Sequence, residues 1–249
     1  MLHIKKTDSL PESIEGFLAD DSECRSKKGN VREYFNCFKK RSLKGNLNVR
    51  NKVSLQSHLL GEQGGCCCYC GIRIGKPASV SIEHFTSLTV NSALVLDHGN
   101  LLASCTSRSR CNLGRNDKEQ RKKVQLKNVL NPKRGEASDF YQKMKIKYIL
   151  PGEKVKGVGK ISSGNTEIDK ELNNILSLNN SDLIKCRKEA LNVFISSYEK
   201  LLVCLRSDEL ILDEISTLFE KDDFLAIKMY WLGVELSKSD YLDPTNLNL

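Results

Sequence analysis

The stretch CCCYCGIRIGKPASVSIEHF spans residues 66–85, and a second stretch, GNLLASCTSRSRCNLGR, spans residues 99–115. In the first, two residues separate Cys67 from Cys70 and Gly71 follows, a spacing typical of a metal-binding knuckle. A tight turn places both sulfurs on one side, and a glycine permits the backbone bend that the turn needs. In the second stretch, Cys105 and Cys111 can complete a tetrahedral set of thiolates. We therefore predict a structural Zn²⁺ site formed by Cys67, Cys70, Cys105 and Cys111.

The second cysteine pair departs from the usual knuckle spacing, because five residues rather than two separate Cys105 from Cys111. Residues 106–110 must therefore bulge out between the ligands. Cys66 and Cys68 could compete as ligands, although their side chains should point elsewhere, since they flank Cys67 along the backbone. The alternative to a zinc site is a buried cluster of reduced thiols without a metal.

Charge and cysteine content bound the class of protein. The 249 residues carry a formal net charge of +8 and include ten cysteines. A basic surplus of this size suits a polyanionic partner, since binding releases counterions, but it equally suits a solvated basic surface. No apolar stretch approaches the length of a membrane span and the N-terminus lacks a signal-peptide core, so we expect a cytoplasmic protein. Disulfides are disfavoured there, so free thiols packed as small apolar groups are expected at Cys24, Cys37, Cys186 and Cys204.

Apolar periodicity predicts an α+β, mostly helical fold. Before residue 65 we expect a helix around residues 14–18, a helix after Asn30, and a helix through residues 49–60 that ends at Gly64–Gly65. Asn30 and Glu33 together resemble a capping box. In the centre, β-prone residues 72–74 and 80–82 predict a hairpin, and the charged stretch from Asn112 into Lys122 predicts a helix.

The C-terminal part is predicted to be helical after Thr166. Helical spacing runs from Leu183 through Cys186 to Phe194, with Ser181 as the N-cap, and further helices are expected at residues 209–218 and 224–236. Residues 152–164 are expected to form a hairpin or a boundary. The division that follows is an N-terminal helical segment at 1–65, a central unit at 66–135, and a basic connector with a helical region at 136–249.

A basic stretch follows the cysteine-rich segment. It runs from residue 121 to residue 147 with only two acidic residues. A phosphate-contacting arm and a solvated linker both fit this composition. If the arm contacts nucleic acid, the first residues to do so would be Arg121, Lys122 and Lys123.

Glu83 and His84 lie between the two cysteine pairs. The chain has four histidines, and we interpret His3 and His58 as structural and His98 as part of a turn or rim. His84 differs because it adjoins a carboxylate inside the cysteine frame. An imidazole that titrates near neutral pH can accept a proton from water, so we predict that His84 is a general base.

The order of these residues resembles the HNH nuclease motif. Its elements are Cys-x-Tyr-Cys, Glu83-His84, Asn100-Leu101-Leu102, then Cys105, and Cys111-Asn112 with a basic residue three positions on. Residues 61–65, residues 82–85 and the Asn100–Cys105 run resemble the HNH subunit of Septu-type and retron-associated antiphage systems, the PtuB-like family. The segment Leu176–Asn179 with Leu183 and Arg187 extends the similarity to about three-quarters of the chain.

The resemblance implies a central ββα-metal (HNH) unit with zinc knuckles, flanked by N-terminal and C-terminal helices. It implies an endonuclease that hydrolyses phosphodiester bonds with one catalytic Mg²⁺ or Mn²⁺, held by oxygens of Glu83 and Asn112. Asn100 would orient His84, and Arg115, where the motif usually has lysine, could hold a phosphate oxygen. Many HNH enzymes have aspartate in place of Glu83 and histidine in place of Asn112; an amide oxygen favours a hard ion.

The resemblance also implies partners in antiviral defence. These are a PtuA-like ATPase subunit and, in retron systems, a reverse transcriptase with its multicopy single-stranded DNA. The target could be DNA or an RNA such as a tRNA, because the reacting phosphate is the same. The alternatives are a non-catalytic zinc-binding nucleic-acid-binding or adaptor protein, and a purely structural zinc module that supports an oligomer.

Overall fold

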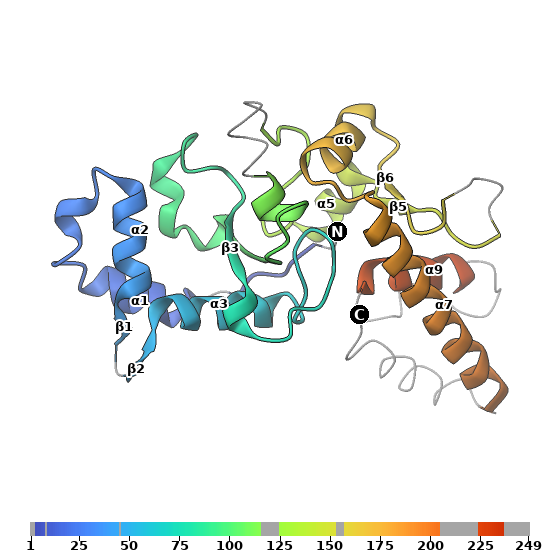
Figure 1. Ribbon diagram of the computed structural model, residues 1–249, viewed down its shortest axis with the longest axis horizontal. Helices are drawn as coiled ribbons and strands as arrows, with labels where there is room; N and C mark the ends of the chain where they lie inside the picture. Colours follow the sequence, from blue (N-terminus) through green and yellow to red (C-terminus); the bar gives the residue numbers. More distant parts are fainter. Residues whose placement is uncertain are drawn as a thin grey trace.

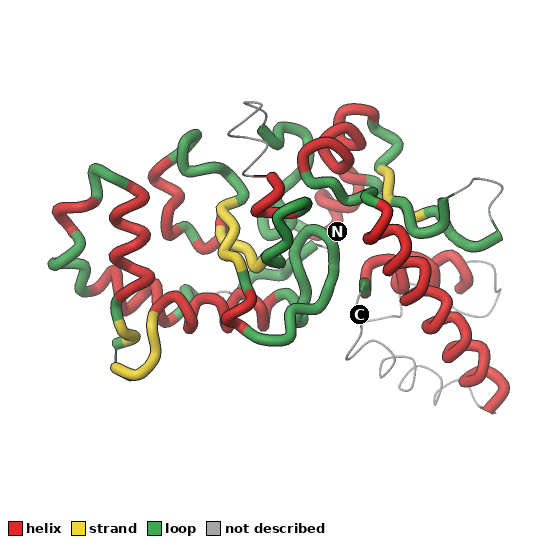
Figure 2. Tube along the Cα trace, viewed as in Figure 1, coloured by secondary structure: helices red, strands yellow, loops and turns green. Residues whose placement is uncertain are grey.

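A computed structural model describes residues 3–7, 9–44, 46–115, 125–152, 157–204 and 224–236, and these form an α+β fold. Helices predominate, and the strands pair into small antiparallel two-stranded sheets (Figure 2). The α-helices are α1 (Glu12–Ala19), α2 (Val31–Lys40), α3 (Asn51–Glu62), α5 (Ala137–Met144), α6 (Thr166–Lys170), α7 (Ser181–Cys204) and α9 (Leu225–Leu236). The strands are β1 (Ser42–Leu43), β2 (Asn46–Arg50), β3 (Ser81–His84), β4 (Leu101–Ser104), β5 (Lys147–Tyr148) and β6 (Ile161–Ser162).

Helices α1 and α2 lie at one end of the molecule and α7 with α9 at the other, while α3 runs from the first end to the middle, below β3 in the view of Figure 1. The predicted N-cap of α2 is confirmed, since the Asn30 side chain accepts a hydrogen bond from the backbone N–H of Glu33. The rings of Phe17 and Phe38 meet edge to face at 5.2 Å, which joins α1 to α2. These contacts hold α2 as a fixed wall beside the centre of the fold.

The third helix starts later than predicted, because a strand occupies the residues before it. Residues 46–50 form β2, which pairs with β1 in the register Ser42↔Arg50 and Leu43↔Asn46, and α3 begins only at Asn51. The β-branched Val49 is therefore in a strand. Backbone pairing with β1 is a tertiary contact that helical spacing along the sequence does not report.

Cys24 and Cys37 form a disulfide, which corrects the expectation that both are free. Their Cα atoms are 6.0 Å apart, and the bond ties α2 to the residue that precedes the short helix η1 (Arg25–Lys27). Cys186 is exposed on α7 rather than packed in the core, and the side chain of Cys204 lies outside the described part. The bonded cysteines are 13 positions apart in the sequence, so only the packing of η1 against α2 brings them together.

The central hairpin forms between different segments from those predicted. β3 pairs with β4, in the register Glu83↔Leu102 and His84↔Leu101, across a loop that carries the short helices η3 (Ser92–Leu96) and η4 (His98–Asn100). Residues 72–74 form no strand with 80–82; Arg73 makes a single bridge to Cys66, and residues 77–79 form the short helix η2 (Pro77–Ser79). All four residues of β4 are buried, which explains why this strand is the partner of β3. The predicted helix after the second cysteine pair is confirmed at residues 111–115, and its continuation to Lys122 lies outside the described residues.

The C-terminal helices pack through aromatic rings. Helix α7 begins at Ser181, but the cap is Asn180, whose Oδ1 accepts from the N–H of Leu183. The expected helix at 224–236 is confirmed as α9, and Trp231 on it meets the Phe194 ring of α7 edge to face at 5.9 Å. The helix expected at 209–218 lies outside the described residues. Strands β5 and β6 pair, which gives the hairpin expected around residues 152–164. The π-helical turn η5 (Glu171–Ile175) follows α6.

Among the described helices, none combines the length and the apolar content that crossing a bilayer requires.

Candidate functional site

The four predicted cysteine ligands come together in one cluster. The sulfur atoms of Cys67, Cys70, Cys105 and Cys111 all lie within 4.8 Å of one another, and those of Cys70 and Cys105 are 4.0 Å apart. Tetrahedral zinc with Zn–S bonds of about 2.3 Å requires sulfurs roughly 3.8 Å apart. The cluster can therefore hold a metal ion such as zinc, as the knuckle spacing predicts.

The five-residue spacing of the second pair is accommodated by a loop that folds back on the following helix. A Cβ on Gly114 would lie 2.7 Å from the backbone carbon of Ser109, so this contact requires glycine. Cys111 has a φ of 55° and donates its backbone N–H to the carbonyl of Leu176. As expected, Cys66 points away: its thiol contacts the carbonyl of Gly64.

The thiols of this cluster influence one another's ionisation. Burial opposes ionisation of Cys67, but hydrogen bonds from the thiols of Cys105 and Cys111 outweigh it, and the pKa of Cys67 falls well below its usual range. The pKa values of Cys70 and Cys111 rise well above that range, chiefly because each shares a hydrogen bond with Cys105. One thiolate is thus stabilised by protonated neighbours, and a bound divalent cation would let all four ionise.

His84 ends strand β3 with one ring nitrogen fixed. Its Nε2 lies 3.0 Å from the carbonyl oxygen of Val95 and must donate, because a carbonyl only accepts. In the neutral ring the acceptor is then Nδ1, to which no described residue hydrogen-bonds. Burial lowers the pKa of His84, and the positive charge of Lys39 lowers it further. The ring is therefore neutral at neutral pH, with a free lone pair on Nδ1.

Asn100 holds the backbone around His84. Its Oδ1 accepts from the N–H of Thr86 at 2.7 Å, and its Nδ2 donates to the carbonyl of Thr86 at 3.1 Å. The Asn100 carbonyl also accepts from the N–H of Phe85. These bonds clamp the segment after β3 onto the loop that carries Val95. Asn100 thus contacts the backbone that follows His84, and none of these hydrogen bonds is to the His84 ring.

Glu83 and Arg115 form a buried ion pair. Arg115 Nη1 donates to Glu83 Oε1 at 2.6 Å, and the hydroxyl of Tyr69 donates to the same oxygen at 2.6 Å. Arg115 Nη2 donates to the carbonyl of Phe85 at 2.8 Å. Only 3% of the Arg115 side chain is exposed, so the structure places this guanidinium on Glu83 rather than at a surface where phosphate was expected. A buried carboxylate needs such a partner.

Asn112 connects the helix start to β3. Its Nδ2 donates to Ser81 Oγ at 2.9 Å and to the carbonyl of Ile82 at 3.2 Å. Asn112, Glu83 and His84 line one cavity of about 590 Å³, together with loop residues 87–89. The structure therefore brings together three of the five predicted catalytic residues at one cavity. The other two, Asn100 and Arg115, do not line it and contact the backbone of Thr86 and the side chain of Glu83.

The opposite wall of the His84 cavity is helix α2, which the sequence prediction treated only as a packing helix. Its lining residues include Arg32, Phe35, Asn36 and Lys39. The Phe35 ring meets the His84 ring edge to face at 4.8 Å, and Lys39 Nζ lies 5.0 Å from the Phe35 ring centre. The signal in the sequence is a set of aromatic residues enclosed by two cations, Arg32 and Lys39. The predicted nucleic-acid residues Arg121, Lys122 and Lys123 lie outside the described residues.

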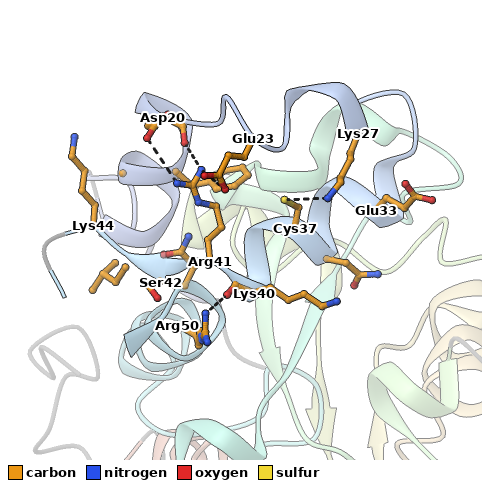
Figure 3. A pocket seen from close by; sticks show the side chains of 15 residues that line it. Asp20, Glu23, Lys27, Glu33, Cys37, Lys40, Arg41, Ser42, Lys44 and Arg50 are labelled. Atoms are coloured by element: carbon orange, nitrogen blue, oxygen red, sulfur yellow. Dashed lines mark hydrogen bonds and ion pairs between the residues drawn. The ribbon is translucent and has the colours of Figure 1, made fainter. Parts of the chain in front are cut away.

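A larger cavity of about 850 Å³ lies along another side of α2 (Figure 3). Its charges are largely satisfied within the protein: Arg41 contacts the carboxylates of Asp20 and Glu23, and Arg50 donates to the carbonyl of Lys40. Cys37, the sulfur in its lining, is in the disulfide. This cavity contains no histidine, and we do not assign it to the chemistry.

Comparisons of the chain with protein-family models, with curated proteins and with solved structures find no match.

Proposed function

We propose that this chain is a metal-dependent endonuclease of the HNH type that hydrolyses phosphodiester bonds in nucleic acid. One observation carries the proposal. A neutral imidazole, fixed at Nε2 by Val95, shares a cavity with the oxygen-bearing side chains of Glu83 and Asn112. A positioned base beside two oxygen ligands is the minimum that metal-assisted hydrolysis requires.

The local architecture supports the same proposal. An antiparallel pair, β3 and β4, is followed by a helix that begins at residue 111, and the cysteine cluster joins these parts. Strand, strand and helix in this order are the elements that the proposed ββα-metal unit requires. The proposed unit places His84 at the end of its first strand and Asn112 in the first turn of its helix.

A carboxylate and an amide oxygen suit a hard cation, so Glu83 and Asn112 would hold Mg²⁺ or Mn²⁺. Such an ion, when bound, polarises the phosphate and stabilises the departing oxygen. Arg115 and Tyr69 already donate to Glu83, which reduces the negative charge available to the ion. We therefore expect the ion to bind weakly without substrate and to need phosphate oxygens to complete its shell.

The residues of the chain account for the proton and for the charge of the substrate. His84 Nδ1 takes the proton of the attacking water, while the bond to Val95 keeps the other nitrogen protonated. Arg32 and Lys39 on α2 face the cavity and would attract the phosphate backbone. Arg115 holds Glu83 in position instead of contacting phosphate.

We propose further that the nuclease acts as an effector in antiviral defence with a partner ATPase of the PtuA type, and with a reverse transcriptase and multicopy DNA where the system is a retron. The support is the family resemblance of the motif. A nuclease of this kind must be restrained inside its host, so we expect low activity from the chain alone and stimulation by the partner.

The test is cleavage of supercoiled plasmid and of total RNA with Mg²⁺, with Mn²⁺ or with EDTA, with and without the co-encoded ATPase. We expect cleavage that needs a divalent ion and that falls by about 10²–10⁴-fold in His84→Ala. The matched control is His3→Ala, which changes a histidine far along the chain and should cut as the wild type does.

A chain that binds nucleic acid equally well with and without His84, and that cuts nothing under any of these conditions, would reject the nuclease. The second candidate function is a zinc-binding adaptor without catalytic activity. The buried Glu83–Arg115 pair favours it, because such an adaptor needs no metal at Glu83.

A further inference from the structure

A second group of metal-ligating side chains lies at the C-terminal end of α3, separate from the cysteines. It consists of His58, Glu62 and His98, which the sequence prediction treated as structural or did not single out. One ligand atom from each lies within 4.8 Å of the others. We propose that these three residues form a second metal site, for a borderline divalent ion such as Zn²⁺.

The secondary structure explains how the three side chains meet. His58 and Glu62 are four residues apart on α3, so they project from the same face one turn apart. His98 opens the short helix η4, which precedes β4. The pairing of β3 with β4 therefore fixes the third ligand relative to the first two, and the His58 and His98 rings lie 5.2 Å apart, centre to centre.

The distances between the ligand atoms fit a tetrahedral ion. His58 Nε2 lies 3.5 Å from Glu62 Oε1, and His98 Nε2 lies 3.1 Å from the same oxygen. With metal bonds of about 2.0–2.1 Å, neighbouring ligand atoms should be roughly 3.4 Å apart. Two histidines and one carboxylate also leave a fourth position open, as zinc sites with exchangeable ligands do.

The open position is on the side of Thr7. Its Oγ1 lies 3.2 Å from His58 Nε2 and 3.1 Å from Glu62 Oε1, and its backbone N–H donates to that oxygen at 2.9 Å. Thr7 is exposed, and with His98 it lines a cavity of about 410 Å³, so we infer that an ion would reach the group from this side. A metal site needs such an entry path.

Lys133 contacts the other oxygen of the carboxylate. Its Nζ lies 2.5 Å from Glu62 Oε2, and both side chains are almost fully buried. His98 Nε2 also lies 3.2 Å from Oε2, so His98 faces both carboxylate oxygens and His58 faces Oε1. Lys133 fixes this orientation from outside the set of ligands, as such partners commonly do. The ammonium charge also repels a cation, so we expect this site to bind zinc more weakly than the four thiols and to exchange it.

The two proposed metal sites have different ligand chemistry, which makes this one measurable by itself. A cysteine site takes its metal through thiolates, whereas His58, Glu62 and His98 offer only nitrogen and oxygen. The inference does not depend on the nuclease proposal, because His84 contributes no atom to the group.

The test is the zinc bound at equilibrium, measured by dialysis of the full chain against a fixed free concentration of Zn²⁺, because a site that exchanges its ion would lose it if free zinc were removed. We expect His58→Ala to retain one zinc fewer per chain than the wild type, while His3→Ala and His84→Ala retain as many as the wild type. His84→Ala separates this site from the cavity beside α2. Because about a quarter of the His58 side chain is exposed, its truncation should leave the thermal unfolding of the chain nearly unchanged.

A second measurement uses Co²⁺ in place of Zn²⁺ on the wild-type chain. The cysteine cluster should give a thiolate-to-cobalt charge-transfer band that saturates first, followed by a further equivalent that adds only weak ligand-field absorption. A wild-type chain that saturates at one ion, or a His58→Ala chain with the same zinc content as the wild type, would overturn the second site. In either case the three residues would form only a hydrogen-bonded network.

Discussion

The cysteine cluster and the His84 cavity are built on the same short hairpin, yet they differ in kind. The cluster consists of four like ligands, largely buried and in contact with one another. The cavity has one imidazole, one carboxylate and one amide around about 590 Å³ of open space. A closed set of soft ligands stabilises a fold, whereas a mixed and open set can admit a substrate. The difference fits a structural role for the cysteines and, under the function proposed above, a role for the cavity in binding substrate.

The largest effect is expected from breaking the cluster. Cys70→Ser should abolish zinc binding by the cysteine cluster and unfold the segment around residues 66–115, because structural zinc contributes about 10–16 kcal/mol in zinc-finger peptides. Circular dichroism during heating, combined with zinc content, measures both losses. The matched control is Cys186→Ser, which alters an exposed thiol on α7 and should behave as the wild type does. A Cys70→Ser chain that melts at the wild-type temperature would show that the cluster is not structural.

A smaller effect is expected from breaking the buried ion pair between Glu83 and Arg115. Arg115→Met leaves the Glu83 carboxylate buried without its cation and should lower the free energy of unfolding by about 3–5 kcal/mol in urea titrations. Adding Glu83→Gln to that variant removes the unpaired charge and should restore much of the loss. For comparison, Lys170→Met removes an exposed partner of Glu167 and should change stability by less than about 1 kcal/mol. Equal losses for the two ion pairs would mean that Glu83 is not held as described.

The smallest effect concerns the tuning of the base. Lys39→Gln should raise the pKa of His84 slightly, because one of the two causes that lower it is removed. Burial is the larger cause, so the pKa should remain below the ordinary value of about 6.5. Titration of the ring signals by NMR measures the shift, and Lys40→Gln, which removes the neighbouring charge facing the other cavity, should leave His84 nearly unchanged. If the pKa of His84 is unaffected by Lys39→Gln, the charge of Lys39 does not influence the ionisation of His84.

The same pKa shift sets the direction of a pH effect on stability. Because the folded chain disfavours protonated His84, the unfolded chain binds more protons as the pH falls below the ordinary histidine pKa. The contribution of His84 to stability is thus present above that pKa and is lost as the pH falls. If His84 is the general base, as we propose, it stays neutral to a lower pH than a solvated histidine would, and cleavage should persist below about pH 6.5.

Local sequence determined much of this protein. The spacing of Cys67 and Cys70 with Gly71, the capping of α2 by Asn30, and the position of His84 beside Glu83 are all set within a few residues, where turn and cap geometry apply directly. For this reason the four cysteines were correctly predicted to form one cluster that can hold a metal, despite the longer spacing of its second pair. Chemistry that depends on short separations can be predicted from the chain alone.

Tertiary structure decided the rest, because each remaining feature joins segments that no local rule connects. The partner of β3 is a strand about twenty residues away, the disulfide depends on the packing of η1 against α2, and the far wall of the His84 cavity is α2 itself. The burial of Arg115 on Glu83 was equally invisible, since a basic residue after the motif suits phosphate as well as a carboxylate. A buried charge or polar group needs a partner, and the fold decides which side chain meets it. The order of residues alone does not specify which groups become buried together.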